Sequence, residues 1–155
     1  MSFEVTVVEF PAKQLVGMKV STTMQNAQAD CPAIWQIFGL RMTEIPAKGG
    51  HGADSYGLSI MTSENAFDYW AAMELNPKAA IPDGMGTIDI PGGLFAKCTV
   101  ANLSRLGEAF TFVYGTWISG QSEYALNMAA PCFEVYSQNW QMGDTIDIYV
   151  PVVKK

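Results

Sequence analysis

The chain has 155 residues, a length that suits one domain able to bury a core without disulfides or metal ions. Hydrophobic residues make up 49% of the chain, charged residues only 15%, and the formal net charge is −6. Nucleic-acid binding requires a concentrated basic face, and the sequence offers no basic cluster beyond Lys154 and Lys155, so we expect no direct binding to nucleic acid.

The cysteines and the start of the sequence indicate the compartment. Cys31, Cys98 and Cys132 lie far apart and are odd in number, a pattern that predicts neither a zinc site nor a disulfide framework. The first residues lack a basic leader followed by an apolar stretch, and no apolar run is long enough to span a membrane. We therefore expect a cytoplasmic protein without metal, cofactor or membrane contact.

The first half of the chain predicts a β-α-β-β unit, in which a proline-interrupted strand segment is followed by a helix and two further strands. Residues 8–16 read apolar, acidic, apolar, proline, turn and then a fresh apolar run. A helix is predicted next, with Asp30 as its N-cap and with apolar residues at helical spacing, namely Cys31, Ile34, Trp35, Phe38 and Met42. Strands are predicted at 56–61 and 67–73, after a glycine-rich loop at 48–52 that contains His51.

The second half repeats this order about 80 residues later, after a connecting loop marked by residues 76–78 and 82–84. Residues 88–95 resemble 8–16, a helix with Leu103, Leu106, Phe110, Val113, Tyr114 and Trp117 starts near Asn102 or Ser104 and ends near Gly120, and strands follow at 132–137 and 145–150. We predict one α+β domain over 1–155, built from two β-α-β-β repeats (about 1–78 and 84–155) with pseudo-twofold symmetry, an antiparallel sheet, two main helices and a central ligand cleft.

Glu134 is the main candidate for a functional residue. Strand alternation places Phe133 and Val135 on one face and Glu134 with Tyr136 on the other, and Tyr149 is expected to lie near Glu134 if the last two strands pair. A carboxylate among aromatic rings is costly unless a positive charge neutralises it, which a ligand cation could do. The alternative is a glutamate on the solvent face of a strand, the commoner fate of this residue type. The helix aromatics could likewise be plain core.

The sequence resembles the GyrI-like domain, the effector-binding module of AraC-type and MerR-type multidrug regulators. The resemblance rests on short matches that cover nearly the whole chain: residues 9–11, 32–38, 56–58, 133–136 and 148–152. It implies binding of hydrophobic, cationic aromatic small molecules, for sensing or sequestration, in an aromatic pocket with a central glutamate. The glutamate of the family's Phe-Glu-x-Tyr strand corresponds to Glu134, and the remaining ligand-binding residues implied are Tyr149, Tyr56, Trp35, Phe38, Trp70 and Trp117.

The family's regulators also carry a helix-turn-helix domain, for which this sequence has no room, so it is similar to stand-alone members. Two alternatives stay open. Some relatives hydrolyse reactive natural products, and Glu134 near a tyrosine hydroxyl could serve as a general base. Other relatives are linked to gyrase inhibition or to other macromolecular partners, and haem-binding SOUL proteins share the architecture. His51 is the sole imidazole, and we expect it at a loop tip, so neither a catalytic triad nor haem ligation is favoured. We expect a binding module and not an enzyme.

Overall fold

The computed structural model describes residues 3–41, 44, 54–74, 80–137 and 143–155. Within these ranges the strands are β1 (Val5–Phe10), β2 (Lys13–Thr23), β3 (Ser55–Met61), β4 (Ala66–Glu74), β5 (Gly86–Ile90), β6 (Gly93–Val100), β7 (Tyr124–Leu126), β8 (Cys132–Tyr136) and β9 (Ile146–Lys154). The helices are α1 (Ala27–Arg41) and a second helix made of a 3₁₀ turn (Leu103–Arg105), α2 (Leu106–Thr111) and a π-helical segment (Phe112–Trp117).

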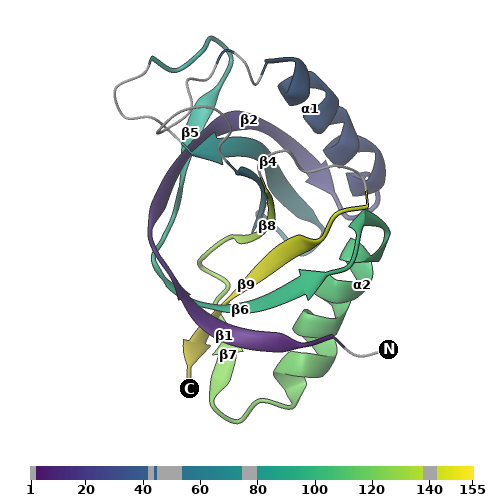
Figure 1. Cartoon of the computed structure of the whole chain (residues 1–155), viewed down its shortest axis with the longest axis vertical. Helices are drawn as coiled ribbons and strands as arrows, with labels where there is room; N and C mark the ends of the chain where they lie inside the picture. The colour runs from purple at the N-terminus through teal and green to yellow at the C-terminus, as the bar shows by residue number, and fades with distance from the viewer. Residues whose placement is uncertain (1–2, 42–43, 45–53, 75–79, 138–142) are drawn as a thin grey trace.

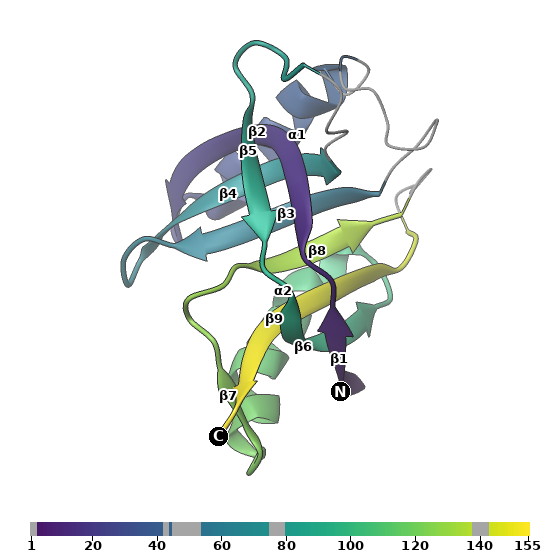
Figure 2. The ribbon, with the colours of Figure 1, turned by 90° about the vertical axis from the view of Figure 1, so that its left-hand side faces the viewer.

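The strands form one antiparallel sheet in the order β1-β6-β9-β8-β3-β4-β2-β5, with β7 added beside β9. The two halves of the chain meet in the middle of this order, where β3 pairs with β8. Each half also gives its first strand to the other half, because β1 pairs with β6 and β5 pairs with β2. Figure 2 shows β1 running into β2, and β5 into β6, across the two halves. Pro11 and Pro91 follow β1 and β5 at the points where these strands break.

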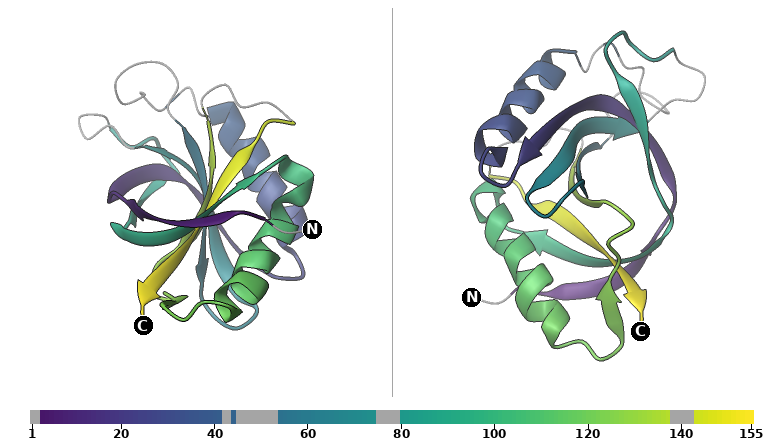
Figure 3. Two further views of the ribbon diagram at one scale, coloured as in Figure 1. Left: turned by 60° about the horizontal axis from the view of Figure 1, so that its bottom comes forward. Right: turned by 180° about the vertical axis from the view of Figure 1, so that it is seen from behind.

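Both helices cover the same face of the curled sheet (Figures 1 and 3). The core under α1 comprises Val16, Ile34, Phe38, Phe67, Tyr69, Ala71 and Met73. The core under α2 comprises Ala96, Cys98, Val100, Ala109, Val113, Ile148, Val150 and Val152. A third cluster fills the inside of the curl, on the opposite face, with Leu15, Tyr56, Leu58, Ala72, Ile90, Phe95, Phe133 and Tyr149. The seam between β3 and β8 therefore has one face toward the helices and one toward this third cluster.

The predicted fold class is confirmed, since the sheet is antiparallel, two main helices pack on it and the two halves follow a similar order of elements. The order differs from β-α-β-β in detail: each half has two strands before its helix, and β7 has no counterpart among the described residues of the first half. The four strands predicted after the helices match β3, β4, β8 and β9 closely, although β9 continues past residue 150. Residues 82–84 lie in the connecting loop predicted there and form a turn, in which the amide of Met85 donates to the carbonyl of Pro82. Residues 48–52 and 76–78 lie outside the described residues.

Two helix details need correction or addition. α1 begins at Ala27, so Asp30 lies in its first turn and is not the N-cap; its carboxylate accepts a hydrogen bond from the Thr22 hydroxyl at 2.7 Å. The second helix does start at Asn102, whose side chain accepts from the Ser104 amide. None of the helices in the described ranges is both long enough and apolar enough to cross a membrane.

Candidate functional site

Glu134 lies in the middle of β8, on the face of the sheet that the helices cover. Its alternation with Phe133 and Val135 is the reason, because those two side chains pack in the cluster on the opposite face. Only 5% of Glu134 is exposed, and it is the one charged residue that is buried within the described part of the chain. A buried carboxylate is rare unless it is paired or strongly hydrogen-bonded, so its contacts decide what it can do.

Two tyrosines donate hydrogen bonds to this carboxylate. The Tyr69 hydroxyl from β4 lies 2.6 Å from Oε1 of Glu134, and the Tyr136 hydroxyl, two residues along β8, lies 3.1 Å from the same oxygen. Trp35 on α1 then donates its indole N–H to the Tyr69 hydroxyl at 2.8 Å. The ring of Trp35 also meets the ring of Tyr136 edge-on, with 5.4 Å between centroids. The carboxylate is thus held from β4, β8 and α1 together.

Gly57 in β3 makes room for this arrangement. It pairs directly with Glu134 across the seam between the two halves. A Cβ atom on Gly57 would lie only 2.3 Å from the Tyr69 hydroxyl and 2.4 Å from Oε1 of Glu134, so no larger residue fits without moving both. Gly57 pairs with Ala71 in β4 as Glu134 pairs with Ile148 in β9, at the same sequence spacing, so Gly57 and Glu134 occupy equivalent places in the two repeats.

The charge of Glu134 is not balanced by any ion pair between described residues. Burial raises the pKa of Glu134 to about 7, while the hydrogen bonds from Tyr69 and Tyr136 act in the opposite direction. Burial also raises the pKa of Tyr69 well above its usual value, so both phenol partners stay neutral donors near neutral pH. The site therefore holds a carboxylate that exchanges its proton near neutrality and lacks a positive partner in the described chain.

The sequence-predicted aromatic residues divide between the two faces of the sheet. Trp35 and Phe38 lie on α1, on the Glu134 side, with their rings 5.9 Å apart. The expectation that Tyr149 lies near Glu134 on one face is wrong, because β8 and β9 pair Phe133 with Tyr149 and Glu134 with Ile148. Tyr149 instead stacks on Phe133 at 4.8 Å on the opposite face.

Tyr56 and Trp70 also belong to that opposite face. Tyr56 pairs with Val135 and is buried beside Phe133, while Trp70 packs against the edge of the same cluster. Trp117 is on the helix side but packs at the end of the π-helical segment, over the core under α2. Of the seven predicted ligand-binding residues, the structure brings together Glu134, Trp35 and Phe38.

Sequence reasoning did not include Tyr69, Tyr136 and Gly57 among the site residues. Tyr136 carried a signal, since strand alternation already placed it beside Glu134 on one face. Tyr69 carried a weaker one: a buried tyrosine hydroxyl needs a hydrogen-bond partner, but the partner depends on how β4 and β3 align. For Gly57 the signal is a glycine inside a strand, which often marks a close approach by another group.

An apolar cleft of about 660 Å³ opens on the helix side of the sheet, next to this carboxylate. Its floor includes Ser59 in β3 and Cys132 in β8, and α2 and the segment after β7 form its walls. Ser59 pairs with Cys132, one residue pair beyond Leu58 and Phe133, and two beyond Gly57 and Glu134. The predicted central cleft thus lies beside Glu134 rather than around it.

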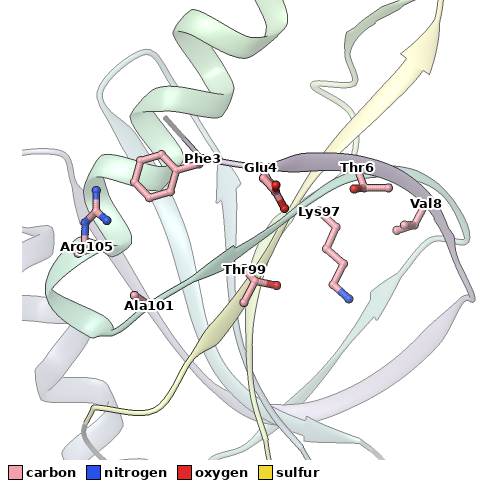
Figure 4. Close-up of a pocket in the computed structure, with 8 residues that line it drawn as sticks. All are labelled: Phe3, Glu4, Thr6, Val8, Lys97, Thr99, Ala101 and Arg105. Carbon is pink, nitrogen blue, oxygen red and sulfur yellow. The ribbon is translucent and has the colours of Figure 1, made fainter. Parts of the chain in front are cut away.

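A second hollow, of about 470 Å³, lies over the paired strands β1 and β6 at the edge of the sheet (Figure 4). Its two basic residues already have acidic partners: Lys97 lies 3.8 Å from Asp147 and Arg105 lies 3.3 Å from Glu108. It is therefore a weaker candidate site than the buried carboxylate.

Comparison with known proteins identifies a family to which this chain is similar. The family model Cass2, described as integron-associated effector binding protein, matches residues 6–152. The transcriptional regulator BrlR of Pseudomonas aeruginosa is 27% identical over an alignment 154 residues long that covers 94% of this chain and 54% of BrlR, so the chain spans about half the length of that relative.

Solved structures share the fold at low sequence identity. SAV2435 bound to tetraphenylphosphonium has a TM-score of 0.78 at 18% identity, over 97% of this chain and 94% of that one. An integron cassette protein from the mobile metagenome of Vibrio cholerae has a TM-score of 0.69 at 16% identity, over 96% and 95% of the two chains. The C-terminal domain of EcmrR has a TM-score of 0.72 at 14% identity, over 100% of both.

These matches confirm the GyrI-like, effector-binding resemblance that the sequence indicated. The family model runs from β1 into β9 and so includes both repeats and the seam where Glu134 lies. The chain belongs to the Cass2 family of integron-associated effector binding proteins.

Proposed function

We propose that this effector-binding domain takes lipophilic aromatic cations, with the cationic centre against Glu134 and the aromatic groups of the ligand against Trp35, Tyr69 and Tyr136. The observation that carries the proposal is a buried carboxylate with hydroxyl donors and with no ion pair among the described residues. The protein would use the site for sensing or sequestration, because the family is described as effector binding and the relative BrlR is a transcriptional regulator.

The physical argument begins with the cost of burying Glu134. Removing a carboxylate from water is unfavourable by several kcal/mol unless a positive charge lies close by, and here the cost is met in part by protonation. A ligand cation supplies the missing charge and favours the ionised form. Each ring that faces the cation adds about 0.5–2 kcal/mol. The site therefore selects for positive charge combined with apolar surface.

The rings around Glu134 also explain how such a site could be selective yet adaptable. The rings of Trp35 and Tyr136 meet edge-on beside the buried carboxylate, and we expect them to part when a ligand enters. Small hydrated ions gain little from this opening, because they offer no apolar surface to the separated rings. In support, SAV2435, which has the same fold, has been solved with the aromatic cation tetraphenylphosphonium. Tyr149, Tyr56 and Trp70 are left out of the proposed site because they lie on the other face of the sheet.

The test is a titration of the purified protein with tetraphenylphosphonium. Binding is measured by calorimetry and by tryptophan fluorescence, to which Trp35 contributes directly. We expect Glu134→Gln to weaken binding at least tenfold, a loss of about 1.4 kcal/mol or more. Glu9→Gln is the matched control, since Glu9 is an exposed strand glutamate on β1, and its affinity should equal that of the wild type. A wild type that does not bind, or a Glu134→Gln protein that binds equally well, would refute the proposal.

A further inference from the structure

The apolar cleft and the Glu134 site share one continuous floor. Ser59 pairs with Cys132 in β8 on one side and with Tyr69 in β4 on the other. Cys132 precedes Glu134 by two residues and lies on the same face of β8, and the Tyr69 hydroxyl donates a hydrogen bond to Glu134. Two residues along a strand span about 7 Å. The floor of the cleft at Cys132 thus lies about 7 Å along the strand from Glu134.

The walls of this cleft are apolar and carry no charge among the described residues that line it. Phe110 and Tyr114 stack on each other along the helix, with 6.5 Å between centroids and 27° between ring planes. Phe67 and Leu126 add further apolar surface. The volume of about 660 Å³ falls in the range of about 300–1,000 Å³ typical of ligand pockets. A cation would find no counter-charge among these lining residues, whereas a hydrocarbon chain would find apolar surface to pack against.

Three methionines border the cleft: Met24, Met61 and Met128 are 53%, 39% and 68% exposed. Large exposed apolar side chains are unfavourable in water, and unbranched thioethers adapt their shape to flexible apolar guests. The π-helical segment Phe112–Trp117 contributes Tyr114 and Gly115 to the same cleft, and such irregular turns occur frequently at functional sites.

From this continuity we infer that the cleft holds a flexible hydrocarbon arm of the ligand whose cationic head lies at Glu134. The inference rests on the proposed function and narrows its ligand class to cationic amphiphiles, such as quaternary ammonium compounds with one long alkyl chain. The head and the arm are bound by different means. Glu134 and its rings select the charge, and the uncharged cleft takes methylene groups out of water.

The experiment compares butyltrimethylammonium with dodecyltrimethylammonium, which share one head, by calorimetry below the micelle-forming concentration. Each fully buried methylene tightens binding about fourfold, so burial of half of the extra chain gives about 200-fold. The methyl NMR signals of Met24, Met61 and Met128 should shift with the dodecyl compound and stay in place with the butyl compound.

Gly115→Leu blocks the cleft without touching the carboxylate site. A Cβ atom on Gly115 meets nothing within 4 Å, so the leucine enters open space, and leucine also favours a helix over glycine. Gly107→Leu is the matched control, because Gly107 is equally open, lies on the same helix and does not line the cleft. We expect Gly115→Leu to weaken dodecyltrimethylammonium at least tenfold, with butyltrimethylammonium within twofold, and Gly107→Leu to change neither.

The outcomes separate this inference from the proposed function. Equal affinities for the two compounds in the wild type, or an equal loss of both in Gly115→Leu, overturn the inference while binding at Glu134 stands. If Glu134→Gln binds both compounds as the wild type does, or if the wild type binds neither these compounds nor tetraphenylphosphonium, the proposed function fails and the inference fails with it.

Discussion

Lowering the pH should weaken the binding of a permanently charged ligand through Glu134 alone. Burial raises the pKa of this carboxyl to about 7 from its usual 4.5, so in the free protein it is mostly ionised at pH 8 and mostly protonated at pH 5.5. Tetraphenylphosphonium has no titratable group and favours the ionised carboxylate. Its affinity should therefore fall about 30-fold from pH 8 to pH 5.5, with a slope that approaches tenfold per pH unit below pH 7.

Among the described residues, the cysteines and tyrosines whose pKa values are raised by the charge of Glu134 do not titrate in this range. Burial raises the pKa of Cys31 to about 12 and that of Cys132 to about 11, and the pKa values of Tyr69 and Tyr136 are raised as well. All of them are neutral from pH 5.5 to pH 8. The change in affinity over this range is therefore assigned to Glu134.

The assay is calorimetry in two buffers with different ionisation enthalpies, which counts the protons released on binding. Below pH 7 the wild type should release close to one proton per ligand bound. A His51→Gln variant, which removes the only histidine, should behave as the wild type does. A wild type with pH-independent affinity, or a His51→Gln protein that loses the dependence, would refute the assignment.

The free energy of unfolding should also depend on pH through Glu134, and it should fall as the pH rises. The native state holds the Glu134 proton more tightly than the unfolded state does, so the associated stability is present in full below pH 4.5 and is lost as pH rises through about 7. The difference corresponds to about 3 kcal/mol at most. Urea unfolding at pH 4.5 and pH 8 should show this loss in the wild type relative to Glu134→Gln, and parallel curves for the two proteins would contradict it.

Three substitutions test the geometry further. Gly57→Ala should destabilise the protein by about 1–3 kcal/mol in urea unfolding and weaken tetraphenylphosphonium binding, because its Cβ displaces Tyr69 and Glu134; unchanged stability would show that the strands yield easily. Tyr69→Phe removes a hydroxyl donor from the carboxylate and should raise the pKa of Glu134, shifting the midpoint of the affinity profile to higher pH; an unmoved midpoint contradicts this role. Tyr149→Leu should lower the free energy of unfolding by about 1–2 kcal/mol but leave ligand affinity within twofold. A larger loss of affinity would mean that the ligand binds on the face of the sheet that carries Tyr149, and not on the Glu134 face.

The strand pattern and the internal repeat were enough to predict most of the fold. The spacing of apolar residues gave β3, β4, β8 and β9 close to their observed bounds, and the repeat implied a sheet built from two halves. The exchange of β1 and β5 between the halves was not predictable from either half, because each repeat alone fits a local strand pairing equally well. The short strand β7, which pairs with β9 alone among the described strands, is too short for its alternation to be detected.

In the site, the residues placed by alternation within one strand were predicted, and those placed by the register between two strands were not. Alternation within β8 correctly separated Glu134 from Phe133, because side-chain direction is a property of one strand. The place of Tyr149 depends instead on how two strands align, and a shift of one residue moves every side chain of a strand to the other face. The pairing of Phe133 with Tyr149 could not be read from either strand separately. Tyr69 was missed for the same reason, since its contact with Glu134 crosses β3.

The direct pairing of Gly57 with Glu134 leaves room for only one carboxylate at the seam between the repeats. These two residues occupy the same place in the two repeats, on opposite sides of the twofold seam, and their side chains would meet in one volume. Two identical half-domains associating as a dimer would carry either two glutamates in collision or two glycines with no charge at all. A lone carboxylate at the seam needs two repeats with different sequences, as this chain has, and the site that we propose would therefore take one cation per chain.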